Sequence, residues 1–575
     1  MRGIGPALKG PALQAQERRR PAPGVRPSGS APAVSSAVVP SSAGGRSRLD
    51  SLHRTLDWTD AFWVASGVPA LVLFTIGAIV STIGQPSWVI WILSISIGFI
   101  QSFTYAEISG LFPHKSGGAS VYGAIAWVRY SKFIAPISVW CNWIAWSPVL
   151  TLGTSLAAGY VLASLFPQDA MINTWSLRLV NLGSGPGALT LRINAISVLG
   201  IFFLLLTFAL QHRGALRAAG MQKILGVASL LPLVVIGVVP MITGDMPATH
   251  FFPILPLAHD SAGHVVFGAW NAAGWTLAMA SMFIAAWSTY GFETAVCYTR
   301  EFKNPSSDTF KAILFSGMLC MVIFTLVPIS FQGALGLTRL LDKGIYDGTG
   351  VGVALAKMVG GGVIITNLIV VMLILSLLLA VMTSMMGSSR TLYQASVDGW
   401  LPRYLSQVNE HGSPTRAMWT DLGFNVLLLL MSDYFIVLAV SNVCYIVFCF
   451  LNLQAGWIHR LDRGDWERPF RCPTWLLALG GLLGYVDMAF VGAGADIWRP
   501  GTLRDGLIAI TFIVPVFVFR HYVQDKGRFP DAMLEDMDLR PDAERRQRAG
   551  VLPYLSLALC ALVVWGTHAL AVLPS

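Results

Sequence analysis

Charged residues are scarce in this chain. Only 12% of its 575 residues are charged, whereas roughly 25% is usual in soluble globular proteins, and 54% are hydrophobic. The charges are also segregated, because the stretch Phe133–Phe166 contains none. This composition excludes an ordinary soluble globular protein.

Patterns for disulfides, metal sites and nucleotide sites are missing as well. The seven Cys lie mostly inside apolar runs without a pairing pattern, which is typical of small buried residues. No His spacing suits metal ligands, and no Gly-rich phosphate loop of the Walker type occurs. We therefore expect no cofactor and no metal, and no enzyme, since no cluster of acid, base or metal-ligating residues is visible.

Long apolar runs, by contrast, are abundant. A membrane-spanning helix needs about 20 apolar residues, and thirteen runs approach or exceed this length. They are 62–80, 86–108, 133–165, 193–211, 223–243, 271–298, 312–336, 362–388, 416–432, 434–458, 473–493, 503–520 and 551–573. The weakest division separates 416–432 from 434–458 at Ser432 and Asp433. The sequence predicts an all-α polytopic membrane protein with about 13 transmembrane helices, in contact with a lipid bilayer.

Lys and Arg are distributed unevenly between alternate loops. With a cytoplasmic N-terminus, only seven of the 39 basic residues face the other side, namely Arg178, Arg192, Arg339, Lys343, Lys357, Arg499 and Arg504. This bias follows the positive-inside rule. It also explains the net charge of +9 by an anionic membrane face, without a nucleic-acid partner. We expect a multi-pass protein of the plasma (inner) membrane with a cytoplasmic N-terminus and an external C-terminus.

The first 55 residues differ from the rest. They are largely Arg, Pro, Ser, Ala and Gly, with Glu17 as the single acid before Asp50. Such a segment cannot bury a core, so we predict a disordered basic tail over residues 1–55. Its Arg- and Ser-rich, acid-poor composition is also compatible with a targeting sequence, and an overlong start-site assignment is a third interpretation.

Two apolar runs are interrupted by residues that disfavour a regular helix. One interruption is Ser66-Gly67-Val68-Pro69-Ala70, and the other is Trp287-Ser288-Thr289-Tyr290-Gly291-Phe292-Glu293. Non-helical backbone at membrane depth is tolerated only where protein or a water-filled cavity satisfies its polar groups. Two broken spans at corresponding places in two halves are typical of a secondary transporter with its substrate site at the midplane.

The runs can be divided accordingly. Residues 56–245 and 270–460 each hold five spans with the broken one first, and an odd number of helices inverts the second set. Helices 11 and 12 follow in 472–520, and residues 521–575 hold a cytoplasmic linker and a thirteenth run. Pro553 and His568 in that last run leave open a helix lying on the membrane surface.

Three motifs carry a resemblance to a known family. They are Tyr105–Glu107 with Phe112–Tyr122, Trp287–Thr294 leading to Glu301–Pro305, and Ser388–Tyr393 followed by Asp398–Pro402. Over residues 60–520 the chain resembles an amino acid permease of the amino acid–polyamine–organocation (APC) superfamily. The resemblance implies the LeuT-type fold, a 5+5 inverted repeat, here with additional C-terminal helices.

The resemblance also implies a substrate site at the two breaks. Backbone amides at a helix end attract a carboxylate, so Ser66, Gly67, Val68, Pro69 and Ala70 are expected to hold that group, although Pro69 removes one N–H donor. Trp287, Ser288, Thr289, Tyr290 and Gly291 would face the substrate, with Trp287 as a gate that can stack on a cation. Glu293 is an acid within an apolar span and therefore a functional candidate, for proton-linked gating or for a cationic substrate. Trp143 and Trp146 suggest further aromatic lining, whereas Asp487, in span eleven, is interpreted as structural.

The coupling ion is less certain from the sequence. Some proton-coupled relatives have a Lys in span five, where this chain has Ser229, and Lys223 lies too near the cytoplasm. Thr383 and Ser384 fall where sodium-coupled relatives place hydroxyl ligands, next to carbonyls near Ala65. Na+ coupling, H+ coupling and simple exchange all remain open.

We interpret the chain as a secondary active transporter that moves an amino acid or related amine by alternating access. An uncoupled amino acid exchanger and a transporter-like amino acid receptor are the alternatives. The sequence does not name the substrate or the oligomeric state.

Overall fold

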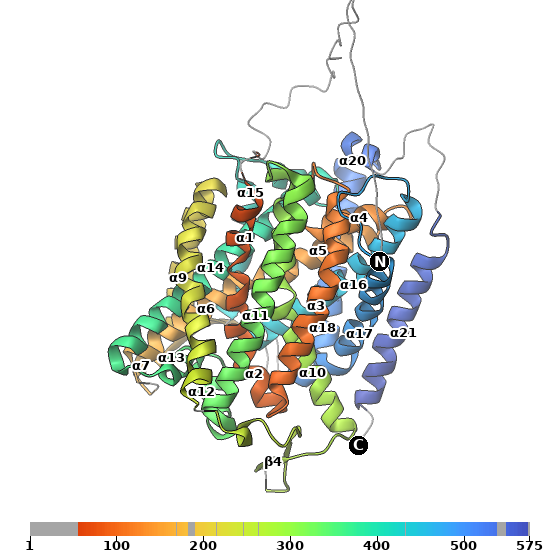
Figure 1. The fold of residues 1–575 in the computed structure, drawn as a ribbon. Coiled ribbons are helices and arrows are strands. Elements are labelled where there is room, and N and C mark those ends of the chain that lie inside the picture. Colours follow the sequence, from red (N-terminus) through yellow and green to blue (C-terminus); the bar gives the residue numbers. More distant parts are fainter. Residues whose placement is uncertain are drawn as a thin grey trace, which may run out of the picture. The chain divides into compact units, whose positions relative to one another are not determined.

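The computed structural model describes residues 54, 56–167, 169–181, 190–213, 215–244, 246–262, 264–431, 433–536 and 548–572. Most of the tail predicted as disordered, and residues 537–547 of the linker, lie outside these ranges. The described chain is almost entirely helical, and long helices run side by side through it (Figure 1). The predicted all-α polytopic membrane fold is confirmed.

The first predicted break is a real interruption. Helix α1 (Trp58–Ala65) ends at Ser66, the 3-10 segment η2 (Val68–Leu71) follows, and α2 (Val72–Ile83) continues the path. Pro69 lacks an N–H and lies at the start of η2, where such a group needs no helical partner. The start of α1 is fixed by Asp57, whose carboxylate accepts from the backbone N–H groups of Thr59 and Asp60.

The second break lies at the end of α10 (Ala272–Thr289). After Tyr290 the chain changes to the long 3-10 segment η4 (Gly291–Glu301), and α11 (Pro305–Leu340) begins beyond it. A 3-10 run of 11 residues is unusual, because its hydrogen-bond geometry is poorer than that of an α-helix. The predicted span 271–298 therefore changes helical type within its length, inside the segment predicted as its interruption.

Eleven helices in the described residues are long and apolar enough to cross a membrane. They account for eleven of the thirteen predicted runs. The other two runs correspond to α10 and α15 (Thr415–Met431), which are shorter or less apolar. With 17 residues, α15 is about 25 Å long. All thirteen predicted runs thus contain helices, and eleven of these helices meet both the length and the hydropathy expected of a membrane span.

The remaining membrane helices keep the predicted order with adjusted ends. The third span is divided at Ser147 into α5 (Ile134–Trp146) and α6 (Pro148–Leu165). The others are α3 (Ser87–Gly110), α8 (Ala195–His212), α9 (Ala215–Thr243), α14 (Gly362–Val397), α16 (Tyr434–Asp462), α17 (Thr474–Trp498), and α18 (Thr502–Thr511) with α19 (Ile513–Val518) and the π-helical segment η6 (Phe519–Gln524).

The last helix, α21 (Leu552–Val572), runs along the bundle. Its Tyr554 hydroxyl donates to the Tyr130 carbonyl at one end of the bundle, and His568 lies 3.3 Å from the Gly492 carbonyl near the other. It packs along α17 at the edge of the bundle (Figure 1). This placement fits a thirteenth run that crosses and does not fit a helix lying flat on the surface.

Short elements connect the helices at the two ends of the bundle. They are α4 (Ala119–Trp127), α7 (Met171–Thr174), η3 (Ala248–His250), α12 (Lys343–Tyr346), α13 (Val351–Val359), η5 (Arg403–Ser406) and α20 (Asp531–Asp536). The expectation of an all-α chain missed two antiparallel hairpins in loops, β1 (Ser176–Asn181) with β2 (Thr190–Asn194) and β3 (Leu257–His259) with β4 (Val265–Phe267). These short loop segments carry no clear hydrophobic period, so the sequence pattern gave no signal for the strands.

These elements define two sides of the bundle, shown at opposite ends in Figure 1. We call the end that carries α20 the α20 side and the end that carries the hairpins the hairpin side. Met533 of α20 is fully buried, and Phe529 before it packs on Trp400 with ring centroids 5.1 Å apart. The segment around α20 is therefore docked on the bundle.

Candidate functional site

The two breaks lie together in the middle of the bundle. The Thr75 and Ser288 hydroxyls, on α2 and α10, are 2.7 Å apart and hydrogen-bonded. At Gly291 a Cβ atom would lie 2.7 Å from the Trp146 ring and 3.1 Å from Leu71. Glycine is required there because any side chain would separate the second break from the first.

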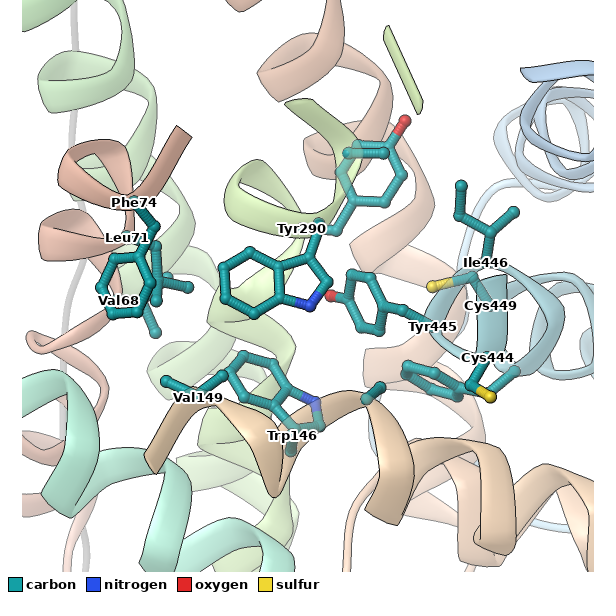
Figure 2. Packing of buried hydrophobic residues seen from close by; sticks show 14 of the residues in the cluster. Val68, Leu71, Phe74, Trp146, Val149, Tyr290, Cys444, Tyr445, Ile446 and Cys449 are labelled. Carbon is teal, nitrogen blue, oxygen red and sulfur yellow. The ribbon is translucent and has the colours of Figure 1, made fainter. Parts of the chain in front are cut away.

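A small space lies beside the second break. It is lined by Ala145, Trp146, Val149, Trp287 and Tyr445 and has no room for a water molecule. Figure 2 shows Val68, Leu71 and Phe74 on one side of this region and Tyr445 on the other, with Trp146 and Val149 along a third edge. The site is collapsed around largely apolar side chains.

Trp287, predicted as the gate, is buried at this space. Its ring packs on Phe74 with centroids 5.6 Å apart, and its exposed fraction is 3%. Trp146 meets Tyr445 edge to face at 5.9 Å. Of the three expected aromatic residues, Trp146 and Trp287 line this space, whereas Trp143 donates to Asp421; Tyr445 of α16 completes the lining.

Glu293 is buried at the start of η4. Its Oε1 accepts a hydrogen bond of 3.3 Å from the Trp146 indole, and its Oε2 has no partner among the described residues. The nearby Ser288 hydroxyl bonds Thr75 and not Glu293. One carboxylate oxygen therefore remains available beside this space.

The other residues of the second break are held by neighbouring helices. The Thr289 hydroxyl is 2.7 Å from that of Ser94 on α3. Asp487 of α17 accepts from the Tyr290 hydroxyl at 3.0 Å and from the Gln101 amide at 2.6 Å. Asp487 thus fixes Tyr290, which agrees with a structural role and places that role at the break.

The hydroxyl groups proposed for a coupling ion gather around the first break. A Cβ at Gly67 would lie 2.5 Å from the Thr383 hydroxyl, so glycine lets the break approach α14 closely. A Cβ at Gly226 of α9 would lie 2.7 Å from the Ser66 hydroxyl, and Ser229 follows within one turn. The buried Ser384 hydroxyl has no partner among the described residues. Ala65, Val68, Pro69 and Ala70 are buried in the same region.

Lys223 lies apart from this cluster. Its ammonium pairs with the carboxylate of Asp60 near the start of α1, toward the α20 side. The sequence placed Lys223 too near that end to act at the break, and the pair with Asp60 is in keeping with this.

The three sequence motifs meet on the α20 side. Lys115 of the first motif pairs with Asp398 of the third at 2.5 Å, and Arg390 of the third pairs with Glu301 of the second through two N–H groups. The backbone N–H of Gly117 donates to the Cys297 carbonyl at 3.0 Å. Segments almost 300 residues apart in the chain thus form one interlocked layer.

Comparison with known proteins agrees with this architecture. A family model described as amino acid permease matches residues 56–517, most of the chain. The chain belongs to the amino acid permease family. It is 23% identical to the branched-chain amino acid permease BcaP of Lactococcus lactis subsp. cremoris, over 76% of this chain and 88% of that protein. It is 24% identical to a polyamine transporter of Oryza sativa subsp. japonica, over 82% of this chain and 79% of that one. This permease is therefore a multi-pass membrane transporter of a small molecule, and not an enzyme.

On the hairpin side the permease is hollowed. A cavity of about 350 Å³ is lined by residues that include Thr151, Leu152, Arg192, Asp433 and Tyr434. The Tyr434 hydroxyl donates to the Phe74 carbonyl at 3.0 Å, and Phe74 in turn packs on Trp287. Tyr434 and Phe74 thus connect the lining of this cavity to Trp287 at the central site.

One buried acid escaped the sequence analysis. Asp421 of α15 is fully buried and accepts hydrogen bonds from Trp143, Ser147 and Ser388. It lies inside the predicted run 416–432, and an acid in an apolar run is the same signal that singled out Glu293.

Proposed function

We propose that this permease moves an amino acid or related amine by alternating access around the space between the two breaks. Support comes from the meeting of both interrupted helices at a site with a buried tryptophan and a buried acid. The α20 side holds buried ion pairs, whereas the hairpin side has a cavity lined in part by Tyr434, whose hydroxyl donates to the Phe74 carbonyl. A substrate would enter from the hairpin side when these side chains move, and leave when the motif layer opens.

The lining favours an amino acid with an apolar side chain. Val68, Leu71, Phe74, Val149 and Trp287 are all buried around the site, and an aliphatic chain there would replace water with apolar contacts. The backbone at the first break would receive the carboxylate. A long polyamine has several cationic groups, and the site has one nearby acid, Glu293, with a single unpaired oxygen. That oxygen supports a cationic amine as the second candidate.

Coupling is proposed to use groups other than a fixed ammonium. Ser229, Thr383, Ser384 and carbonyls near Ala65–Val68 would offer neutral oxygens to Na+, which suits a hard cation. Glu293 offers a separate route for H+, and exchange without a coupling ion is the third possibility. A lysine mechanism is disfavoured because Lys223 is engaged by Asp60.

The test is uptake into proteoliposomes containing the full chain. A panel of branched-chain, small and cationic amino acids and polyamines would be supplied under Na+ or pH gradients at zero membrane potential. Na+-driven accumulation abolished by Ser384→Ala supports the hydroxyl site. H+-driven accumulation that survives Ser384→Ala and is lost in Glu293→Gln overturns the sodium proposal. Polyamine uptake without amino acid uptake overturns the apolar substrate.

The proposed orientation is an N-terminus and α20 side in the cytoplasm of a plasma (inner) membrane. The bias of Lys and Arg supports it. Labelling of single cysteines introduced at exposed positions Tyr404 and Trp175, on the α20 and hairpin sides, would test it in intact cells. Labelling of position 404 from outside would reverse the orientation.

A further inference from the structure

Asp421 is an acid in the interior of the bundle with no cation to balance it. Its exposed fraction is 0%, and in the described chain no Lys, Arg or His pairs with it. An uncompensated carboxylate in the membrane interior is costly and marks a functional site by default. Asp421 therefore requires an explanation beyond packing.

Three neutral groups surround the carboxylate. Oδ1 accepts from the Trp143 indole at 2.9 Å and from the Ser147 hydroxyl at 2.5 Å, and Oδ2 accepts from the Ser388 hydroxyl at 2.5 Å. Serine hydroxyls rotate and can either donate or accept. The pocket can therefore satisfy both the ionised carboxylate and the neutral carboxyl, without moving the backbone.

The nearest cations on every element packed against Asp421 are occupied elsewhere. On α15 itself Arg416 donates to Gln407, on α14 Arg390 pairs with Glu301, and on η5 Arg403 pairs with Asp525. His212 at the end of α8 packs on Phe208, Arg192 of β2 lines the hairpin-side cavity, and α5 and α6 contain no charged residue. The charge of Asp421 is thus set by a proton and not by a neighbouring ion pair.

A line of polar side chains leads from Asp421 to the hairpin-side cavity. Ser147 accepts from the Asn425 amide at 2.8 Å, and Asn425 Oδ1 accepts from the Thr151 hydroxyl at 2.8 Å. Thr151 lines the cavity of about 350 Å³. These groups give water molecules partners along a route through an otherwise apolar interior.

The same acid is linked to the central site. Ser147 and Trp143, which bond Asp421, flank Trp146, whose indole donates to Glu293 at 3.3 Å. Ser147 is also the junction between α5 and α6, just before Pro148. A change in the charge of Asp421 would alter the hydrogen bonds at this junction, and the junction carries the indole that touches Glu293.

We propose that Asp421 is a proton-binding residue of the transport cycle. With the hairpin side open, a hydronium ion gives its proton to a carboxylate oxygen of Asp421 and leaves as water. The neutral carboxyl persists while the permease changes its access, and the O–H bond then breaks to water on the α20 side. This inference rests on the proposed transport function and assigns H+ to a residue distinct from Glu293 and from the hydroxyl cluster.

The experiment compares exchange with accumulation in proteoliposomes of the full chain. A gradient of one pH unit drives up to about tenfold accumulation if one proton accompanies each substrate. The variant Asp421→Asn mimics the neutral carboxyl, so we expect it to retain substrate exchange, to lose the pH-driven accumulation to a ratio of about one, and to flatten the pH profile of exchange. Asp505→Asn, at a partly exposed acid of α18 that pairs with Arg504 outside the site, is the control for loss of a carboxylate and should keep the wild-type shape of the pH profile.

Each outcome decides the proposal. Accumulation by Asp421→Asn equal to wild type, or an unchanged pH profile, overturns it. Exchange by wild type without pH-driven accumulation upholds transport and overturns the proton role, while no exchange of any substrate overturns both. If Asp421→Asn does not fold, Ser388→Ala keeps the acid and removes one donor to its charged form, so the pH profile of transport must shift to higher pH; an unshifted profile overturns the proposal.

Discussion

The two sides of this permease are closed by different physics. On the α20 side, charged side chains from distant segments pair in the interior, such as Arg390 with Glu301 and Lys115 with Asp398. On the hairpin side, a cavity is lined in part by Tyr434, whose hydroxyl donates to the Phe74 carbonyl, and the Phe74 ring packs on Trp287. Removing one partner of a buried ion pair leaves an uncompensated buried charge, whereas removing one aromatic ring loses only its packing contacts. Buried ion pairs therefore close the α20 side, and the packing of a few aromatic side chains closes the hairpin side.

Removing a buried ion pair on the α20 side should have the largest effect on stability and transport. Arg390→Ala leaves Glu301 buried without its partner, which costs about 3–5 kcal/mol. We expect a large loss of thermal stability of the purified protein and loss of transport.

The matched control lies on the hairpin side. Arg499 and Asp433 are 3.3 Å apart and partly exposed, so Arg499→Ala should cost at most about 1 kcal/mol. Equal losses from the two variants would show that the sides are not closed differently.

The docked α20 segment should add a smaller, pH-dependent contribution. Asp536 lies 2.8 Å from Lys115 and 2.7 Å from His114. Burial raises the pKa of Asp536, but the bonds from His114 and Lys115 outweigh it and hold that pKa below its ordinary value of 3.8. Burial also lowers the pKa of Lys115, yet Asp398 and Asp536 bring it above its ordinary 10.5.

The sign of the pH effect follows from these two shifts. A depressed carboxyl pKa stabilises the folded state above pH 3.8, and this contribution is lost as the pH falls through the lower folded value. A raised ammonium pKa stabilises below pH 10.5 and is lost as the pH rises further. As the pH is lowered from 7, the free energy of unfolding should decrease by about 1.5–3 kcal/mol less in Asp536→Asn than in wild type. If the free energy of unfolding depends on pH equally in both proteins, the contact of Asp536 with Lys115 has no role in closing the α20 side.

Between the two sides, transport should depend on the close approach of the first break to α14 at Gly67. Gly67→Ala places a Cβ 2.7 Å from the Leu379 carbonyl oxygen, so the first break must move away from α14, at a cost of about 1–3 kcal/mol. We expect transport to fall while the protein still folds. Gly566→Ala on α21, where nothing lies within 4 Å of the added atom, is the control and should leave uptake unchanged. Normal uptake by Gly67→Ala would show that this approach is not needed.

Loss of the aromatic packing at Trp287 should have the smallest effect, a modest decrease in substrate affinity. Trp287→Ala removes the ring that packs on Phe74 and closes over the site, and the loss of one stacking contact should weaken substrate binding by about 0.5–2 kcal/mol. Binding measured by scintillation proximity would report this change, with thermal unfolding as the check on folding. Wild-type affinity in a folded Trp287→Ala protein would make Trp287 a packing residue only.

Much of the architecture could be predicted from the chain because its signals are local. Apolar runs of membrane length, the bias of Lys and Arg, and the residues Pro69 and Gly291 act within a few positions of themselves. They predicted the helices, the two interruptions and the family resemblance. The hairpins were missed because pairing between loop segments carries no hydrophobic period.

The candidate site was predicted only as separate pieces. The sequence singled out Trp287, Glu293, Thr383 and Ser384 from their own spans, but nothing local indicates that Trp146 donates to Glu293. Asp421 was visible as an acid in an apolar run, and its three donors come from residues 33 to 278 positions away in the chain.

The sequence by itself determined that this chain is a polytopic helical membrane protein with two broken spans, because hydrophobic length and helix-breaking residues act locally. Only the tertiary structure decided which polar groups meet: the motif layer on the α20 side, the collapsed site between the breaks, and the uncompensated carboxylate of Asp421 behind it. Buried charges in a low-dielectric interior are governed by neighbours within a few ångströms. Those neighbours are brought together by helix packing across hundreds of residues, which no local pattern encodes.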